Sequence, residues 1–202
     1  MNEISPIDER SAEYAVSPIF LERWSPRAYD GQPMPEDKLL TVLEAAHWAP
    51  SAYNVQPWRF IYAIKGTPEF DRMLDLLVEF NQGWAKNAGA LVFIVSKTHS
   101  APPGAAEETP NYSHSFDAGS AWGLMSIQAQ ILGYHAHGMT GLKFDKIPET
   151  LNIPEGYRVE AASAIGTQAA PDVLPEALRK NEVPSKRRPL DEVVFKGVFA
   201  AE

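Results

Sequence analysis

An uninterrupted apolar run near the middle of the chain constrains its fold more than any other feature. Residues 88–95 read Ala-Gly-Ala-Leu-Val-Phe-Ile-Val, a run too short to span a bilayer and rich in residues that favour strands. No polar residue alternates with the apolar ones, so a strand formed here has two faces that avoid water. The sequence therefore predicts a central strand over 90–95 that is covered on both sides.

The segments around this run alternate between helix and strand signals. We expect Ser17 to cap the first helix and Asp145 to cap a short one. Helices are predicted over 17–23, 35–49, 68–80, 116–132 and 145–151, strands over 59–64, 134–140 and 159–166, and an irregular loop over 97–113. Such interspersed elements predict an α+β or α/β domain.

Two of these helices carry a pattern that predicts how they face the core. The helix over 116–132 is apolar nearly all round, which predicts a buried central helix. The helix over 35–49 is amphipathic, so we expect one face of it to pack on the core. The residues expected on that face are Leu39, Leu40, Leu43, Ala46 and His47.

The composition fits one soluble domain with arms and excludes several kinds of site. The 202 residues include 26 acidic and 18 basic side chains, for a net charge of −8, and no cysteine. The acidic balance argues against a nucleic-acid partner. The lack of cysteine excludes disulfides, zinc–thiolate sites and iron–sulfur clusters. The polar first residues are unlike a signal peptide, so we expect a cytoplasmic protein with no membrane partner.

Three parts are expected along the chain. Residues 1–16 form an arm, residues 17–170 form the domain, and residues 171–202 form a C-terminal extension. The extension contains prolines at four positions. Its last segment is apolar, but we expect no position in the domain where it could pack. We therefore expect this segment to pack on a second subunit.

Two short clusters of cations stand out in a chain that is acidic overall. Arg23 and Arg27 flank Ser25 where a helix gives way to a loop, and Lys186, Arg187 and Arg188 follow one another in the extension. Guanidinium groups bind phosphate oxygens in a planar, bidentate way, and a serine hydroxyl adds a donor. Each cluster alone is also typical of a solvated surface. Together they are candidates for one anion site.

Two loops are further candidates for ligand contacts. The first reads Pro-Ser-Ala-Tyr-Asn-Val-Gln-Pro-Trp over residues 50–58. Its amides suit hydrogen bonds to a planar heteroaromatic ligand, although a plain helix-to-strand turn explains the same residues. The second, Gly-Met-Thr-Gly over residues 138–141, follows a predicted strand and offers backbone amides.

Other chemistries find little support in the sequence. His135 and His137 would share one face of a strand, but two ligands fall short of the three or four that a zinc site uses. We therefore predict no metal. The hydrolase motif Gly-x-Ser-x-Gly does not occur. The Gly-x-Gly-x-x-Gly and Walker loops of nucleotide-binding proteins do not occur either.

Taken in order, these motifs resemble those of the FMN-dependent nitroreductase family. The similarity consists of Arg-x-Ser-x-Arg at 23–27, Pro-Ser-x-x-Asn-x-Gln-Pro-Trp at 50–58, Asn81 ahead of the central strand, a helix of small residues, and Arg-Arg-Pro-Leu-Asp-Glu-Val-Val at 187–194. It covers about residues 17–196. Each motif alone is common, but the ordered set is specific.

The resemblance implies an α+β nitroreductase-like fold, in which helices flank a central, mostly antiparallel sheet. It implies a homodimer whose C-terminal extension is swapped onto the partner, with FMN bound at the subunit interface. It also implies two-step chemistry: NADPH or NADH reduces the flavin, and the flavin reduces a small planar electron acceptor. The flavin performs this chemistry, so no catalytic side chain is expected.

The resemblance also assigns residues to the FMN site. Those expected around the cofactor are Arg23, Trp24, Ser25 and Arg27; Pro50, Ser51, Ala52 and Asn54 from the other subunit; Asn81; Met139, Thr140 and Gly141; and Lys186 and Arg187. Asn81 is expected at the pyrimidine edge and Arg187 at the phosphate. Residues 139–141 should follow the isoalloxazine face and donate a backbone N–H toward N5. Arg27 is the candidate cation for the negative charge of reduced flavin near N1.

The sequence departs from the family pattern at two tryptophans. Trp84 stands where some relatives carry a lysine, and Trp24 replaces a common basic residue. Tyr53, Tyr112 and Phe116 are candidates for an acceptor pocket and equally for ordinary core or loop aromatics. We expect the acceptors to be nitroaromatics, quinones or activated alkenes. The alternatives are flavin fragmentation, reductive dehalogenation, or a non-enzymatic flavin-binding or storage protein.

Overall fold

A four-stranded antiparallel sheet forms the centre of the chain. The computed structural model describes residues 10–101 and 103–199. Its main strands are β1 (Trp58–Ile64), β2 (Ala90–Lys97), β5 (His135–Met139) and β6 (Tyr157–Gly166). They pair in the order β1-β2-β6-β5, and every pair is antiparallel. β1 and β5 are thus the two edges of this sheet.

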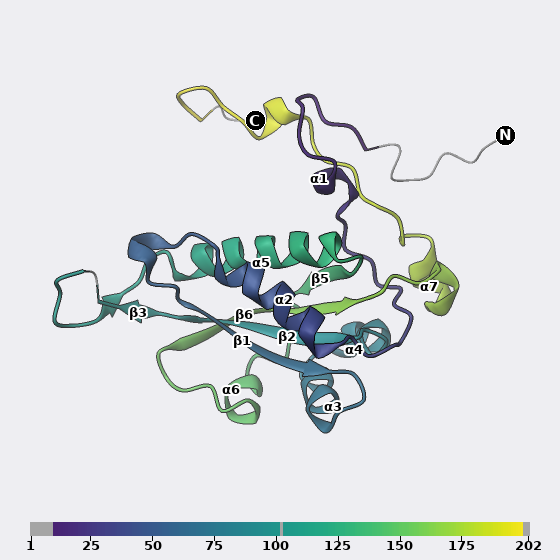
Figure 1. Cartoon of the computed structure of the whole chain (residues 1–202), viewed down its shortest axis with the longest axis horizontal. Coiled ribbons are helices and arrows are strands. Elements are labelled where there is room, and N and C mark those ends of the chain that lie inside the picture. The colour runs from purple at the N-terminus through teal and green to yellow at the C-terminus, as the bar shows by residue number, and fades with distance from the viewer. Residues whose placement is uncertain (1–9, 102, 200–202) are drawn as a thin grey trace.

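Helices cover both faces of the sheet, as Figure 1 shows. Helices α2 (Glu36–His47) and α5 (His114–Ile131) lie on one face, and α3 (Pro68–Asp75) and α6 (Ile147–Thr150) lie on the other. The remaining elements are α1 (Ile19–Glu22), α4 (Glu79–Ala85), α7 (Glu176–Arg179), the 3₁₀ turns η1 (Ala52–Asn54), η2 (Pro171–Val173) and η3 (Leu190–Glu192), and the short strands β3 (His99–Ser100) and β4 (Thr109–Pro110). This arrangement confirms the α+β class. None of the described helices is long and apolar enough to cross a membrane.

The side chains of β2 alternate between two hydrophobic cores. Leu91 and Phe93 pack in the core on the α3 side, whereas Val92 and Ile94 pack in the core on the α2 and α5 side. All four are at most 2% exposed. Burial of each such side chain contributes about 1.5–3 kcal/mol. The prediction of a central strand covered on both sides is therefore confirmed.

The helix predicted over 68–80 consists of two helices, α3 and α4, with a break between them. In the break Leu77 forms a β-bridge with Leu142, and the N–H of Val78 donates to the carbonyl of Gly141 (3.0 Å). These contacts use backbone groups that a continuous helix would have paired within itself. Leu77 and Trp84 pack in the same core, but Phe80 of α4 is 59% exposed, so the apolar period of the sequence does not follow one buried face through the break.

The predicted caps of two short helices are wrong. The N-cap positions of α1 and α6 are Pro18 and Lys146, and neither helix has a side-chain cap within the described chain. Both residues already have right-handed helical dihedrals. Ser17 and Asp145 precede these positions, and neither side chain accepts a cap hydrogen bond from the following turn within the described chain.

The loop predicted over 97–113 contains regular structure. β3 and β4 form a short hairpin in which His99 pairs with Pro110. An ion pair between Lys97 and Glu108 ties the base of the hairpin. Strands of two residues are shorter than the length at which an alternating pattern can be recognised, so they could not be predicted.

The predicted faces of α2 and α5 need correction. Leu40 of α2 is 47% exposed and His47 is exposed as well, although the prediction placed both on the core face. The residues of α2 that are buried are Leu39, Val42 and Ala46. On α5, Phe116 is 81% exposed and Ile131 is 61% exposed. A helix buried all round is therefore wrong for the single chain, and α5 presents apolar side chains outward.

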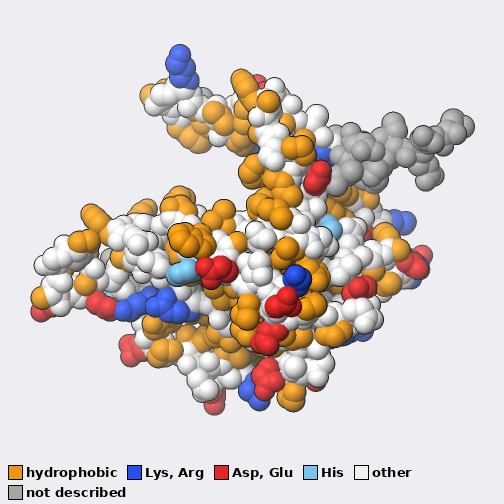
Figure 2. Space-filling model, in the orientation of Figure 1, with side chains coloured by type: hydrophobic (Ala, Val, Ile, Leu, Met, Phe, Trp, Pro, Cys, Tyr) orange, Lys and Arg blue, Asp and Glu red, His pale blue; other side chains and the backbone are white. Residues whose placement is uncertain are grey.

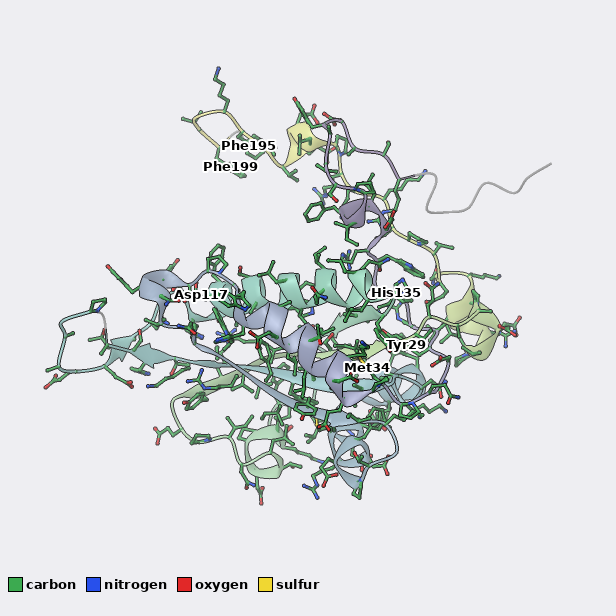
Figure 3. All side chains as sticks on the ribbon, viewed as in Figure 1. Tyr29, Met34, Asp117, His135, Phe195 and Phe199 are labelled. Carbon is green, nitrogen blue, oxygen red and sulfur yellow. The ribbon has the colours of Figure 1, made fainter. Side chains whose placement is uncertain are left out.

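The C-terminal extension rises from the sheet beside the first residues of the described chain (Figure 1). The N–H of Leu190 donates to the carboxylate of Glu13 (3.4 Å), which joins the two segments. Further along, Val194 is 59% exposed, and the rings of Phe195 and Phe199 pack on each other with centroids 4.8 Å apart (Figure 3). Figure 2 shows apolar side chains over this raised part. Such a surface is typical of an interaction site.

Gly89→Ala is expected to lower the free energy of unfolding by about 1–3 kcal/mol. A Cβ at this position would lie 2.8 Å from the carbonyl oxygen of Gln32 and 2.9 Å from the nitrogen of Met34, and both are backbone atoms. Gly83→Ala is the control, because a Cβ there meets no described atom within 4 Å. It should stabilise α4 by up to about 1 kcal/mol. Urea unfolding measures both, and an unchanged midpoint for Gly89→Ala would contradict the close packing.

Candidate functional site

Three arginines from distant parts of the chain lie near one another. Arg23 follows α1, and its Nη1 donates to Ser25 Oγ (3.4 Å). Nη1 of Arg10 donates to the carbonyls of Leu21 (2.5 Å) and Arg23 (3.1 Å). Burial lowers the pKa of Arg23, and the positive charges of Arg187 and Arg10 lower it further. The two cation clusters that the sequence singles out are therefore brought together.

Among the described residues, no acidic side chain forms an ion pair with the arginine cluster (Arg10, Arg23 and Arg187). Nη1 of Arg187 donates to Ser185 Oγ and to the carbonyl of Lys186, both at 3.2 Å and both neutral. Like charges at close range repel, so the arrangement favours an anion between them.

A further cation, Arg27, lies over a buried aromatic stack. Its guanidinium carbon is 6.0 Å from the ring centroid of Trp84, and that ring lies 4.6 Å from the ring of His137. A ring face attracts a cation, most strongly when both are shielded from water. The Nε of Arg27 is buried and has no hydrogen-bond partner among the residues that the structure describes. Arg27 therefore offers a donor for a ligand.

β5 directs His135 and His137 to the same face, under the loop that follows α1. Nδ1 of His137 donates to the carbonyl of Pro26 (2.9 Å), whereas Nδ1 of His135 is buried without a partner in the described chain. Burial lowers the pKa of both histidines, and the charges of Arg23 at His135 and Arg27 at His137 add to this effect. Both rings are held neutral. Among the described residues no group of three or more His, Asp or Glu side chains could hold a metal.

Asn81 and the segment after β5 form a second part of the predicted site. Nδ2 of Asn81 donates to the carbonyl of Gly141 (3.1 Å), and a Cβ at Gly141 would lie 2.6 Å from that nitrogen. Glycine is therefore required for this contact. Asn81 lies one helical turn before Trp84 on α4, so this part adjoins the aromatic stack under Arg27. Met139 is buried and Thr140 is exposed.

The loop of residues 50–54 is well separated from these parts. The N–H of Ala52 donates to Asp117 Oδ2 (3.2 Å) near the start of α5, whereas His135 follows the end of α5 (Figure 3). The helix rises about 1.5 Å per residue, so the fourteen steps from residue 117 to residue 131 span roughly 21 Å. Tyr53 and Asn54 have φ angles of 51° and 55°, which L-residues adopt only under constraint. One chain does not bring this loop to the arginines.

The remaining residues predicted to contact the cofactor lie either in the core or on the surface of the chain. Trp24 is 8% exposed and belongs to the core, so its side chain has little surface to offer a ligand. Pro50 and Lys186 are exposed, and Ser51 is partly exposed. Ser51 Oγ accepts a hydrogen bond from the N–H of Gln56 (3.0 Å) and closes the loop.

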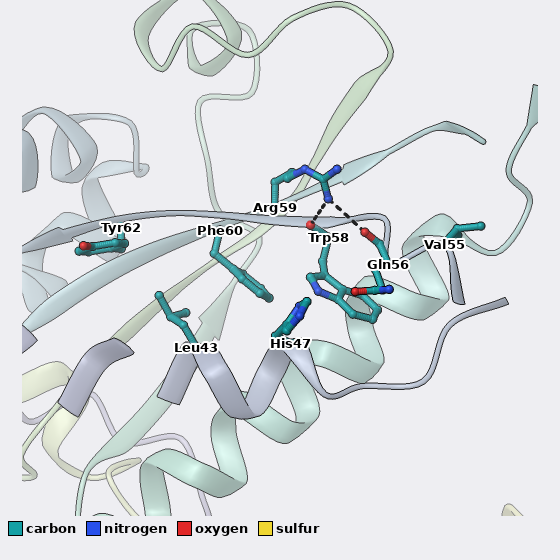
Figure 4. A pocket seen from close by; sticks show the side chains of 8 residues that line it. All are labelled: Leu43, His47, Val55, Gln56, Trp58, Arg59, Phe60 and Tyr62. Carbon is teal, nitrogen blue, oxygen red and sulfur yellow. Dashed lines mark hydrogen bonds between the residues drawn. The ribbon is translucent and has the colours of Figure 1, made fainter. Parts of the chain in front are cut away.

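A pocket of about 540 Å³ lies between α2 and the edge strand β1 (Figure 4). Its lining residues are Leu43, His47, Val55, Gln56, Trp58, Arg59, Phe60 and Tyr62. Nη1 of Arg59 donates to the carbonyls of Gln56 (3.0 Å) and Trp58 (2.6 Å). The pocket adjoins the loop of residues 50–54 but contains none of the predicted cofactor residues.

Sequence reasoning missed Arg10 and Glu182. Glu182 is 5% exposed, and its Oε1 accepts from the N–H groups of Arg27 (2.5 Å) and Ala28 (2.7 Å). These contacts join residues more than 150 positions apart. No local pattern could have revealed them, because an arginine or glutamate in a polar stretch is ordinary surface composition.

The sequence model of the nitroreductase family matches residues 21–82 and 62–167. These matches cover more than half of the chain, which therefore belongs to the nitroreductase family.

Several known proteins are similar to the chain. A solved structure described as an oxidoreductase containing FMN is 51% identical and matches all of both chains with a TM-score of 0.92. A protein of Thermus thermophilus named NADH dehydrogenase is 27% identical over 202 residues, which cover 87% of this chain and 92% of that protein. The CLA biosynthesis enone reductase of Lactiplantibacillus plantarum is 26% identical over 76% of this chain and 86% of its own length.

The neutral histidines are expected to make the ligand-free protein less stable in mild acid. An unfolded histidine takes up a proton near pH 6.5, but folded His135 and His137 do so only at lower pH. The unfolded state then binds more protons, so the free energy of unfolding falls as the pH drops below about 6.5. Urea unfolding between about pH 7.5 and 5.5 measures this change. The double variant His135→Asn/His137→Asn should lose less free energy of unfolding over this pH range than the wild-type protein. The exposed control His99→Asn should lose as much as the wild type. If the double variant and the wild type show the same dependence on pH, the buried histidines are not the cause.

Proposed function

We propose that this member of the nitroreductase family is an FMN-dependent oxidoreductase that uses NADH or NADPH to reduce small planar acceptors. The observation that carries the proposal is the uncompensated arginine cluster beside two buried nitrogens, Arg27 Nε and His135 Nδ1, that lack partners in the described chain. A phosphate dianion and a flat polar ring are the ligand parts that such groups satisfy. FMN contains both.

The similar proteins support the cofactor and narrow the chemistry. The structure that is 51% identical contains FMN, and the Thermus protein is named for NADH. The Lactiplantibacillus protein is an enone reductase, and an enone is one kind of activated alkene. We include nitroaromatics and quinones as acceptors of the same planar class, and we place the enzyme in the cytoplasm, where both nicotinamide cofactors are available.

The residues of the chain would bind and orient FMN, which supplies the hydride-transfer chemistry when bound. Arg23, Ser25 and Arg187 would hold the phosphate, with Lys186 beside them. Arg27, held over Trp84, would lie where the reduced ring carries negative charge. The lysine of some relatives is thus replaced by a ring that presents an arginine.

Asn81 and residues 139–141 would bind the flavin ring. The carboxamide of Asn81 is already oriented by the carbonyl of Gly141, so it is held in place before a pyrimidine edge arrives. Because Gly141 lacks a side chain, a flat ring can approach the backbone closely, and a backbone N–H of this segment would point toward N5.

We propose a homodimer because one chain holds only part of the predicted site. The loop of residues 50–54 and the arginine cluster lie at opposite ends of α5, so each FMN would need the loop from a second chain. The exposed apolar side chains of α5, Phe116 and Ile131 among them, provide a surface for such a partner. A two-fold axis across α5 would complete two equal sites.

The same dimer gives the C-terminal extension a partner surface. The part of the extension beyond Glu182 would wrap the second subunit, with Phe195 and Phe199 as anchors. The pocket beside β1 is a described surface of matching apolar character, and β1 is an edge strand that can accept an extended segment. Swapping the extension in this way would cover the apolar side chains of the extension and those of the pocket beside β1 at the same time.

Anaerobic titration with NADH or NADPH tests the proposed activity. The purified protein should be yellow and should bleach within seconds, because the bound flavin accepts the hydride. The double variant Arg23→Ala/Arg187→Ala should fold but bind FMN at least a hundredfold more weakly, a loss of about 3 kcal/mol for two charged hydrogen-bonding groups. Arg72→Ala/Lys38→Ala removes two exposed cations elsewhere and should bind normally. A colourless protein that takes up no added FMN would exclude the function.

Mixed dimers test whether each FMN site uses two chains. One chain carries Arg23→Ala and Arg187→Ala, and the other carries Ser51→Ala and Asn54→Ala. In the mixed dimer one site combines both sets of defects and the other has neither, so the tagged and isolated mixed dimer should retain about one FMN. Loss of all FMN would show that each site is built from a single chain.

A further inference from the structure

We infer that Glu182 is a positioning residue that holds the C-terminal extension against the backbone of Arg27 and Ala28. It thereby sets where Arg27 and Arg187 stand in the site. The inference rests on the proposed function for its consequence, but its geometry belongs to the chain itself. It adds a residue that neither the motifs nor the family resemblance indicates.

The contact between Glu182 and the loop after α1 is short and shielded. One carboxylate oxygen accepts from the N–H of Arg27 (2.5 Å) and of Ala28 (2.7 Å). Glu182 is 5% exposed. Hydrogen bonds to a charged acceptor are roughly twice as strong as those between neutral groups, and this pair offsets the cost of burying the carboxylate.

The loop between residues 26 and 28 is held from two sides. Below it, His137 donates to the carbonyl of Pro26; on the other side, Glu182 binds the next two N–H groups. These three hydrogen bonds fix the backbone at residues 26–28 and so the direction of the Arg27 Cα–Cβ bond, and the guanidinium lies over Trp84. Glu182 therefore orients the guanidinium without contacting a ligand.

Glu182 also limits the position of Arg187. The two residues are five apart, so their Cα atoms are separated by at most about 18 Å, and Pro184 stiffens the segment between them. On the other side of Glu182, Leu174 is 2% exposed in the core, and Arg179 Nε donates to its carbonyl (2.8 Å). The extension is thus anchored up to Glu182 and leaves the sheet beyond it.

The charge of Glu182 has a second effect on the site. Its other oxygen, Oε2, is buried without a hydrogen-bond partner in the described chain, as is Arg27 Nε. Burial raises the pKa of Tyr29; the charge of Glu182 raises it further and that of Arg27 lowers it, so both charged residues lie near this tyrosine. A negative charge close to Arg27 weakens the stabilisation that this arginine can give to a reduced, anionic flavin.

The test compares Glu182→Ala, Glu182→Gln and the control Glu176→Ala in the full-length protein. Glu176 lies in the same extension but is exposed. In FMN-free protein, Glu182→Ala should speed amide hydrogen exchange at residues 27 and 28 and across 183–190 at least tenfold. It should also raise the dissociation constant for FMN at least tenfold. Glu176→Ala should change neither.

Glu182→Gln separates the hydrogen bonds from the charge. Glutamine keeps an oxygen for the two N–H groups, so it should rescue FMN affinity to within about threefold and keep exchange slow. It should move the flavin midpoint potential to a more positive value, because the opposing charge near Arg27 is gone. An unchanged potential would contradict the electrostatic effect assigned to Glu182.

Two outcomes would overturn the inference. Unchanged exchange in a folded Glu182→Ala protein would show that the carboxylate does not hold the extension, and faster exchange with unchanged FMN affinity would show that the hold does not serve the site. If Glu182→Ala does not fold, the FMN affinity and the flavin midpoint potential of Glu182→Gln still test the inference. Failure of the wild-type protein to bind FMN would refute the proposed function. Hydrogen exchange in the FMN-free protein tests the contact of Glu182 with residues 27 and 28 whether or not FMN binds.

Discussion

The burial of β2 between two layers of side chains is the constraint on which the other elements depend. Leu91 and Phe93 face one core and Val92 and Ile94 the other, and the strand is paired along both edges. A slip of one residue would exchange the two faces, so the register is firmly set. β1 and β5 are then the outer strands, and β5 presents its two histidines at one edge of the sheet.

The arginine cluster is assembled at that edge although its like charges repel one another. Arg10, Arg23 and Arg187 come from three separate segments. Burial lowers the pKa of Arg10 and of Arg23, and the positive charge of Arg187 lowers both further, so the repulsion among the three destabilises the ligand-free chain. Sites where a fold departs from the lowest local energy are commonly sites of function. His137 and Glu182 hold this arrangement in place. They bind backbone groups of the loop after α1 and leave the guanidinium groups available for a ligand.

Several surfaces of the single chain point to a second copy. α5 exposes apolar side chains although its sequence is that of a buried helix, and the extension carries two phenylalanines that pack on each other. The loop of residues 50–54 is largely exposed and contains two residues with left-handed backbone dihedrals, Tyr53 and Asn54. All three features are costly in a monomer and are relieved if a partner covers them. The proposed dimer therefore explains stability and ligand binding by the same contacts.

The sequence by itself determined the local periodicities and, through them, most of the elements. Continuous apolar character predicted β2, the helical period predicted α2 and α5, and the ordered motifs predicted the family and the two cation clusters. These properties are readable because each depends on neighbouring residues. The family resemblance also named Asn81 and residues 139–141, which the structure places in contact.

Only the tertiary structure decided the break between α3 and α4, the caps of the short helices, and the roles of Arg10 and Glu182. Each depends on a partner far along the chain: Gly141 ends a helix that the apolar pattern would continue, and Glu182 meets residues 27 and 28 across the whole domain. The physical reason is that hydrogen bonds and charges act through space over a few ångströms. Sequence patterns report only which residues are near one another along the chain.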